Sequence, residues 1–173
     1  MNTHDTPSIP VLIARATIEM FVRSGKIPSA EDLPPFGTSV AGCFVSLHRQ
    51  GELRGCIGTI LPTKENIRAE IIRNAVSACS DDPRFDPVSP QELADLEIHV
   101  DILDPPQPVS SVQELDPHKY GVIVTSGIKR GLLLPDLAGV DSVEEQLAIA
   151  CRKASISPQE HYSMERFTVT RYS

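Results

Sequence analysis

Residues 53–59 read Leu-Arg-Gly-Cys-Ile-Gly-Thr and decide how the first half of the chain folds. They follow an apolar run at residues 40–48, and the intervening Arg-Gln-Gly-Glu at 49–52 has the composition of a tight turn. We therefore expect strands at 40–48 and 53–60 that pair as a hairpin. Because successive side chains of a strand point to opposite faces, Arg54, Cys56 and Gly58 should share one face of the return strand.

This face of the return strand carries the first candidate chemistry. A guanidinium near a thiol favours the thiolate, so Arg54 is expected to lower the pKa of Cys56. Interior strand glycines mark a bulge or a close approach of other backbone, and a bulge would expose N–H groups that bind an anion. In the alternative interpretation another element packs on Gly55 and Gly58, and Cys56 is a small buried hydrophobic residue.

Residues 63–79 have the apolar spacing of a helix, and the loop that follows is rich in charge. Asn74 falls at the edge of the apolar stripe, where its amide either faces a ligand or ties down a loop. Asp82 lies just beyond the helix C-terminus, where the helix dipole disfavours a carboxylate. Compensation by Arg84 or Arg54 would orient the loop against the hairpin. In the alternative interpretation the loop is solvated and anchored by Phe85.

The remaining segments alternate between helix and strand patterns, with many of the fifteen prolines at the joints. Thr63 is the expected N-cap of the second helix. His99 shares a strand face with two carboxylates, so it is either a general base or one residue of an exposed face. The sequence predicts a mainly antiparallel α+β fold with three main helices. The expected helices are 11–24, 63–79 and 142–154, and the further strands are 96–103, 120–125, 131–134 and 167–170.

Composition limits the function classes. The chain has 173 residues, 40% hydrophobic and 23% charged, which is typical of a globular domain. Its net charge of -7 disfavours non-specific binding to nucleic acids or anionic membranes. We find no secretory signal and no apolar run of membrane-spanning length, so we expect a cytoplasmic protein. The four cysteines and five histidines lack metal-ligand spacing, so we expect free thiols, no metal and no cofactor.

Taken together, these segments resemble the AMMECR-type domain family, which includes protein A of the AmmeMemoRadiSam system. The resemblance rests on residues 53–59, the hallmark segment of the family. It is supported by further matches in order along the chain: Asn74-Ala75, Asp82-Pro83-Arg84-Phe85, Pro87, Glu92-Leu93, Val100-Asp101-Ile102-Leu103, Gly121, Gly131-Leu132-Leu133-Leu134-Pro135 and Cys151-Arg152-Lys153-Ala154. The chain departs from the family pattern at three positions: Asp136 replaces a usual Gln, Ser155 a usual Gly, and Asp101 a common Ser.

The resemblance implies a single domain over residues 1–173, built as two unequal, tightly associated lobes with a cleft lined by the hallmark segments. We also expect residues 1–8 to form a flexible segment. The resemblance implies bacterial and archaeal neighbours, a Memo-like protein and a radical-SAM protein, as partners. It assigns no activity.

Three functions are consistent with these features. The first is a small-molecule site in which Cys56 is a nucleophile or covalent carrier and Arg54 binds an acidic ligand group. The other residues that would line this site are Gly55, Gly58, Asn74, Asp82 and Arg84. The second is a non-enzymatic adapter for the Memo-like and radical-SAM proteins. The third is an RNA-binding role in a modification system, which the negative charge and the absence of Trp disfavour. We favour the first.

Overall fold

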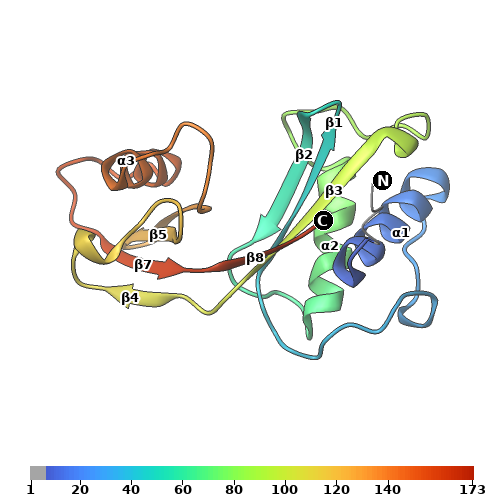
Figure 1. The fold of residues 1–173 in the computed structure, drawn as a ribbon, viewed down its shortest axis with the longest axis horizontal. Coiled ribbons are helices and arrows are strands. Elements are labelled where there is room, and N and C mark those ends of the chain that lie inside the picture. The colour runs from blue at the N-terminus through green and yellow to red at the C-terminus, as the bar shows by residue number, and fades with distance from the viewer. Residues whose placement is uncertain (1–6) are drawn as a thin grey trace, which may run out of the picture. The chain divides into compact units, whose positions relative to one another are not determined.

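The computed structural model describes residues 7–173, so most of the segment 1–8 that we expected to be flexible lies outside the described residues. The chain divides into two compact units (Figure 1). Unit 1 comprises residues up to Ile102 together with Arg171–Ser173, and unit 2 is the continuous segment Leu103–Thr170. Unit 2 is thus inserted in the sequence between the last two strands of the unit 1 sheet.

Unit 1 is a four-stranded sheet with two helices on one face (Figure 1). The strand order is β2-β1-β3-β8, so β2 is an edge strand. Its helices are α1 (Ile9–Ser24) and α2 (Ile67–Ser80), and its strands are β1 (Cys43–Arg49), β2 (Glu52–Thr59), β3 (Leu96–Leu103) and β8 (Val169–Tyr172). Two short 3-10 helices, Ala30–Asp32 and Leu93–Asp95, complete it.

The core of unit 1 follows from strand alternation. Val45 and Leu47 of β1 and Val100 of β3 are fully buried and pack with apolar residues of the two helices, such as Ile18 and Ile71. The alternate residues of these strands point to the other face of the sheet, which no helix of the described residues of unit 1 covers (Figure 1).

The β1–β2 hairpin contains an irregularity that sets its register. Gln50 and Gly51 both have positive φ, 55° and 81°, which is the geometry of a tight hairpin turn. Leu47 pairs with Gly55, but the next residue, His48, pairs with Leu53. Arg54 is therefore an extra residue in β2, a β-bulge. The sequence predicted a bulge near the two glycines, and the structure places it at the arginine.

Unit 2 has its own sheet, helix and core. The sheet order is β4-β7-β5-β6, and α3 packs on it (Figure 1). Val122, Val124, Leu147 and Ala150 are among its buried core residues. The elements are β4 (Gln107–Val109), β5 (Gly121–Ser126), β6 (Lys129–Leu133), α3 (Val143–Lys153), β7 (Ser163–Phe167) and a 3-10 helix, Val112–Glu114.

The α+β class, the antiparallel hairpins and the three main helices are confirmed. The predicted start of the second helix is wrong: α2 begins at Ile67, with Asn66 as its N-cap. Thr63 is not the cap, because its N–H and hydroxyl donate instead to the buried carboxylate of Glu70 at 2.7 and 2.9 Å. The last predicted strand is in fact two, since β7 ends at Phe167 and β8 begins at Val169. Strand β4 was missed, because Pro108 in it suggested a break; as an edge strand it tolerates the proline.

Candidate functional site

Strand β2 presents two different faces. Gly55 and Thr59 face α2: a Cβ on Gly55 would lie 2.3 Å from the carbonyl oxygen of Ala78, and the Thr59 hydroxyl donates to Glu70 at 2.6 Å. Cys56 therefore points to the face without helices.

The ion pair between Asp82 and Arg84 binds both the N–H and the carbonyl of Cys56. The Cys56 N–H donates to Oδ2 of Asp82 at 2.9 Å, and Nη2 of Arg84 donates to the Cys56 carbonyl at 3.3 Å. Asp82 and Arg84 are themselves joined by bonds of 2.7 and 2.9 Å, so the predicted compensation of Asp82 by Arg84 is confirmed. On this edge strand the pair replaces the neighbouring strand that is missing. The N–H that we expected to bind an external anion is thus bound to the chain's own carboxylate.

This ion pair is strongly ionised. The hydrogen bond from Arg84 and those from two backbone N–H groups hold the pKa of the nearly buried Asp82 far below its usual range, against the opposing effect of burial. Its bond to Asp82 chiefly raises the pKa of Arg84, and the negative charge of the Cys56 thiolate adds to this.

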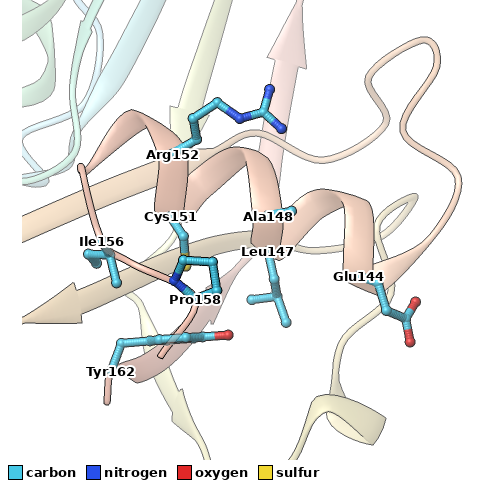
Figure 2. Close-up of a pocket in the computed structure, with 8 residues that line it drawn as sticks. All are labelled: Glu144, Leu147, Ala148, Cys151, Arg152, Ile156, Pro158 and Tyr162. Atoms are coloured by element: carbon cyan, nitrogen blue, oxygen red, sulfur yellow. The ribbon is translucent and has the colours of Figure 1, made fainter. Parts of the chain in front are cut away.

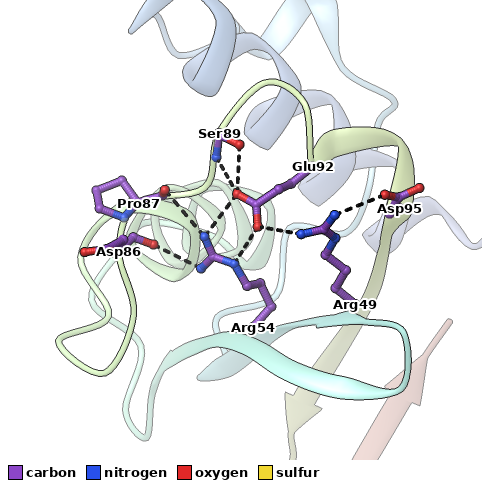
Figure 3. Close-up of polar contacts among 7 residues, drawn as sticks. All are labelled: Arg49, Arg54, Asp86, Pro87, Ser89, Glu92 and Asp95. Atoms are coloured by element: carbon purple, nitrogen blue, oxygen red, sulfur yellow. Dashed lines mark hydrogen bonds and ion pairs between the residues drawn. The ribbon is translucent and has the colours of Figure 1, made fainter.

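Arg54 is anchored to the segment that follows α2 (Figure 3). Its Nε and Nη2 donate to the two carboxylate oxygens of Glu92 at 2.8 and 3.2 Å, and its Nη1 donates to the carbonyl of Asp86 at 3.0 Å. Glu92 also accepts from the N–H and hydroxyl of Ser89, and these bonds, with Arg54 the largest cause, lower the pKa of Glu92 to about 2. Glu92 thus balances the charge of Arg54. The effect of Arg54 on the pKa of Cys56 stays a prediction.

The register places two polar residues in line with Cys56. Ser46 of β1 is the partner of Cys56 in β2 and of His99 in β3, so the three side chains form a row across the sheet. Directly opposite residues have Cβ atoms about 4.5–5.5 Å apart. The His99 ring lies 5.4 Å from that of His48, centroid to centroid. Burial, the largest cause, and the nearby His48 and Arg171 lower the pKa of His99, so it is neutral at pH 7.

Ser46 and His48 were not predicted from the sequence as residues near the site. The alternation of β1 already separates them from its core residues, but only the register shows that Ser46 lies beside Cys56.

The remaining predicted site residues have contacts inside unit 1. A Cβ on Gly58 would lie 2.3 Å from the ring of Phe44. Asn74 is fully buried, and its Nδ2 donates to the Cys43 carbonyl at 2.9 Å and to the Thr59 hydroxyl at 3.1 Å. Their contacts are those of packing and of a structural amide, and a ligand-binding role for them stays a prediction.

The other thiols differ from Cys56. Burial raises the pKa of Cys43 to about 12 and that of Cys79 to about 11, and it also raises the pKa of Cys151. Cys56 is half-buried, on a sheet face that carries a serine and a histidine.

Within residues 7–173, no three His, Cys, Asp or Glu side chains gather as metal ligands would. Nor does any helix in that range have the length and apolarity to cross a membrane.

Comparisons with known proteins match almost the whole chain. The AMMECR1 family matches residues 11–173. A protein of Thermotoga maritima is 55% identical over 159 residues, covering 90% of this chain and 91% of its own length. A longer protein of Clostridium acetobutylicum is 49% identical, and the match covers 94% of this chain but 35% of that protein. The crystal structure of an uncharacterized protein from Pyrococcus horikoshii superposes with a TM-score of 0.85 at 32% identity, over 94% of this chain and 88% of that one. The chain belongs to the AMMECR1 family.

Proposed function

We propose that Cys56 is the reactive thiol of a small-molecule site on the face of the unit 1 sheet that lies away from α1 and α2. The observation that carries the proposal is the fixation of its backbone. Asp82 and Arg84 hold both the N–H and the carbonyl of Cys56, while its side chain emerges on the face that lies away from α1 and α2. Holding a nucleophile in one place lowers the entropic cost of its reaction.

Each neighbour has a role in this proposal. Arg84 stabilises the Cys56 thiolate, and Ser46 and the neutral His99 accept and pass on its proton. Arg54 positions the strand and attracts an acidic ligand group. Gly55 and Asn74 support Cys56 from the side of α2, and Gly58 lies against Phe44 on the same face as Cys56. In the reaction the sulfur bonds to an electrophilic carbon, the π pair of the electrophile moves to its far atom, and the thiol proton ends on that atom.

The test is the alkylation rate of each cysteine by iodoacetamide as a function of pH, resolved by mass spectrometry. Cys151 is the internal control, since it is also half-buried. We expect Cys56 to react at least about ten-fold faster than Cys151 at pH 7. Arg84→Met should slow Cys56 by about three- to ten-fold, because one charge near a thiolate is worth roughly a pKa unit or less at a surface. Arg54→Met should slow it less, because Glu92 balances that charge.

A Cys56 that stays unreactive until the protein unfolds would refute the site. The adapter role would then be favoured, and capture of purified Memo-like and radical-SAM proteins by the wild type, but not by Arg54→Ala, would support it. Binding of RNA that weakens steeply with salt would instead support the RNA-binding alternative.

A further inference from the structure

Unit 2 contains a cavity of about 510 Å³ beside α3, far along the chain from the hallmark segment. This volume falls in the range of small-molecule sites, roughly 300–1,000 Å³. Leu147 and Ile156 are 7% and 5% exposed and form its floor, and Ala148 and Pro158 lie at its edges. The lining is therefore mainly apolar.

Two polar groups, the Cys151 thiol and the Tyr162 hydroxyl, lie among these apolar residues. The side chains of Leu147 and Cys151 point from α3 toward the ring of Tyr162 (Figure 2). The Cys151 thiol and the Tyr162 hydroxyl lie close enough to affect each other's pKa. Burial is the chief cause that raises the pKa of both groups, so both are uncharged at pH 7. A hydroxyl has one donor and two acceptor positions, so the pair retains the capacity to bond one further polar atom.

Neither of the two charged residues that line the cavity lies beside Tyr162. The Arg152 side chain leaves α3 on the side opposite Tyr162, and Glu144 leaves it on the same side as Leu147 but at the other end of the helix (Figure 2). A charged ligand group placed beside Cys151 and Tyr162 would therefore be buried without an adjacent ionic partner, at a large desolvation cost.

We propose that this cavity binds an uncharged, mainly apolar small molecule that carries one hydroxyl or carbonyl group, which bonds to the Cys151–Tyr162 pair. This site is independent of Cys56. The neutral thiol of Cys151 serves here as a hydrogen-bonding group and not as a nucleophile.

Three probes of one size test the charge preference on the intact, ¹⁵N-labelled protein: benzyl alcohol, benzoate and benzylammonium. We expect millimolar benzyl alcohol to shift the amide signals of α3 and of residues 156–162, and the two charged probes to bind at least about ten-fold more weakly. Equal shifts with all three probes, or none with benzyl alcohol, would overturn the proposal.

Two variants locate the site. Ala148→Phe fills the cavity edge and should abolish the benzyl alcohol shifts, whereas Ala94→Phe, at an exposed position in unit 1, should leave them unchanged. Tyr162→Phe should weaken benzyl alcohol by about two- to ten-fold, the effect of one lost hydrogen bond. Dispersed amide signals of the mutated unit itself, unit 2 for Ala148→Phe and Tyr162→Phe and unit 1 for Ala94→Phe, report that each variant is folded. Full binding by Ala148→Phe would show that the probe sits elsewhere and refute the assignment.

Discussion

At the scale of single residues, the charged side chains around the hallmark strand form ion pairs with one another. Arg54 bonds to Glu92, and Arg84 bonds to Asp82. The two acidic members are well shielded, with side chains 14% and 3% exposed, so these pairs exceed an ordinary surface ion pair in their effect on stability. The same residues therefore serve the fold of unit 1 and the placement of the Cys56 thiol.

The Glu92 pair makes stability depend on acid pH. The folded state lowers the pKa of Glu92 to about 2 from an ordinary 4.5, so the unfolded state binds more protons as the pH falls between these values. The stability that Glu92 contributes is complete above about pH 4.5 and is lost as the pH falls toward 2. We expect Glu92→Gln to lower the free energy of unfolding by about 2–3 kcal/mol at pH 7 and to flatten this loss. Urea unfolding at a series of pH values measures both effects.

The matched control for this experiment is Glu52→Gln, at an exposed position of β2. It should leave both the stability at pH 7 and its acid dependence within about 0.5 kcal/mol of wild type. A Glu92→Gln curve parallel to that of the wild type would contradict the assigned role of the Arg54–Glu92 pair.

At the scale of elements, the end of α3 carries a strained residue. Ser155 has a φ of 56°. Its N–H donates to the Arg152 carbonyl at 3.1 Å, and the N–H of Ile156 donates to the Cys151 carbonyl at 2.9 Å. This is the capping geometry that favours glycine, because a Cβ disfavours the left-handed region. Serine at this position therefore costs stability.

Ser155→Gly should raise the free energy of unfolding by about 0.5–1 kcal/mol, because relief of the left-handed strain outweighs the extra freedom of the unfolded chain. For a chain of this size the gain corresponds to a rise in Tm of about 1–4 °C in a thermal melt. Ser155→Ala keeps the Cβ and should give no gain. An equal gain from the alanine variant would show that the serine hydroxyl, and not its backbone, is unfavourable.

At the scale of the whole molecule, unit 2 has the features of an independent folding unit. It has its own sheet, helix and buried cluster. Its ends are joined, since the Asp104 N–H donates to the Thr168 carbonyl at 3.0 Å and the side chains of the same two residues are hydrogen-bonded.

We expect the excised segment 103–170 to fold alone, with a stability of a few kcal/mol, the marginal value typical of so short a chain. Dispersed amide signals and a cooperative urea transition followed by circular dichroism would verify this. The same segment with Val124→Asp, which places a charge at a fully buried position, should be unfolded and is the control. A disordered wild-type segment would show that the unit 2 core is not sufficient on its own.

The sequence by itself determined the α+β class, the three main helices and the two hairpins. Apolar periodicity and turn residues predicted the three helices and the hairpins, because these signals are local. The carboxylate of Asp82 beyond a helix C-terminus predicted a compensating arginine, Arg84 or Arg54, and the structure shows that it is Arg84. Local signals failed at Thr63 and Pro108, where the side chain of Glu70 and an edge position in a sheet changed the outcome.

Only the tertiary structure decided which face Cys56 occupies and what lies beside it. With a two-residue turn and no irregularity, Cys56 would pair with Val45 and point into the core. The bulge at Arg54 shifts the register by one residue, so that Cys56 pairs with Ser46 and points to the face away from α1 and α2. The bulge coincides with the bonds of Arg54 to Glu92 and to the carbonyl of Asp86, more than thirty residues away in the sequence. Because those contacts exist only after the chain has folded, no pattern within residues 43–59 could have predicted the row of Cys56, Ser46 and His99.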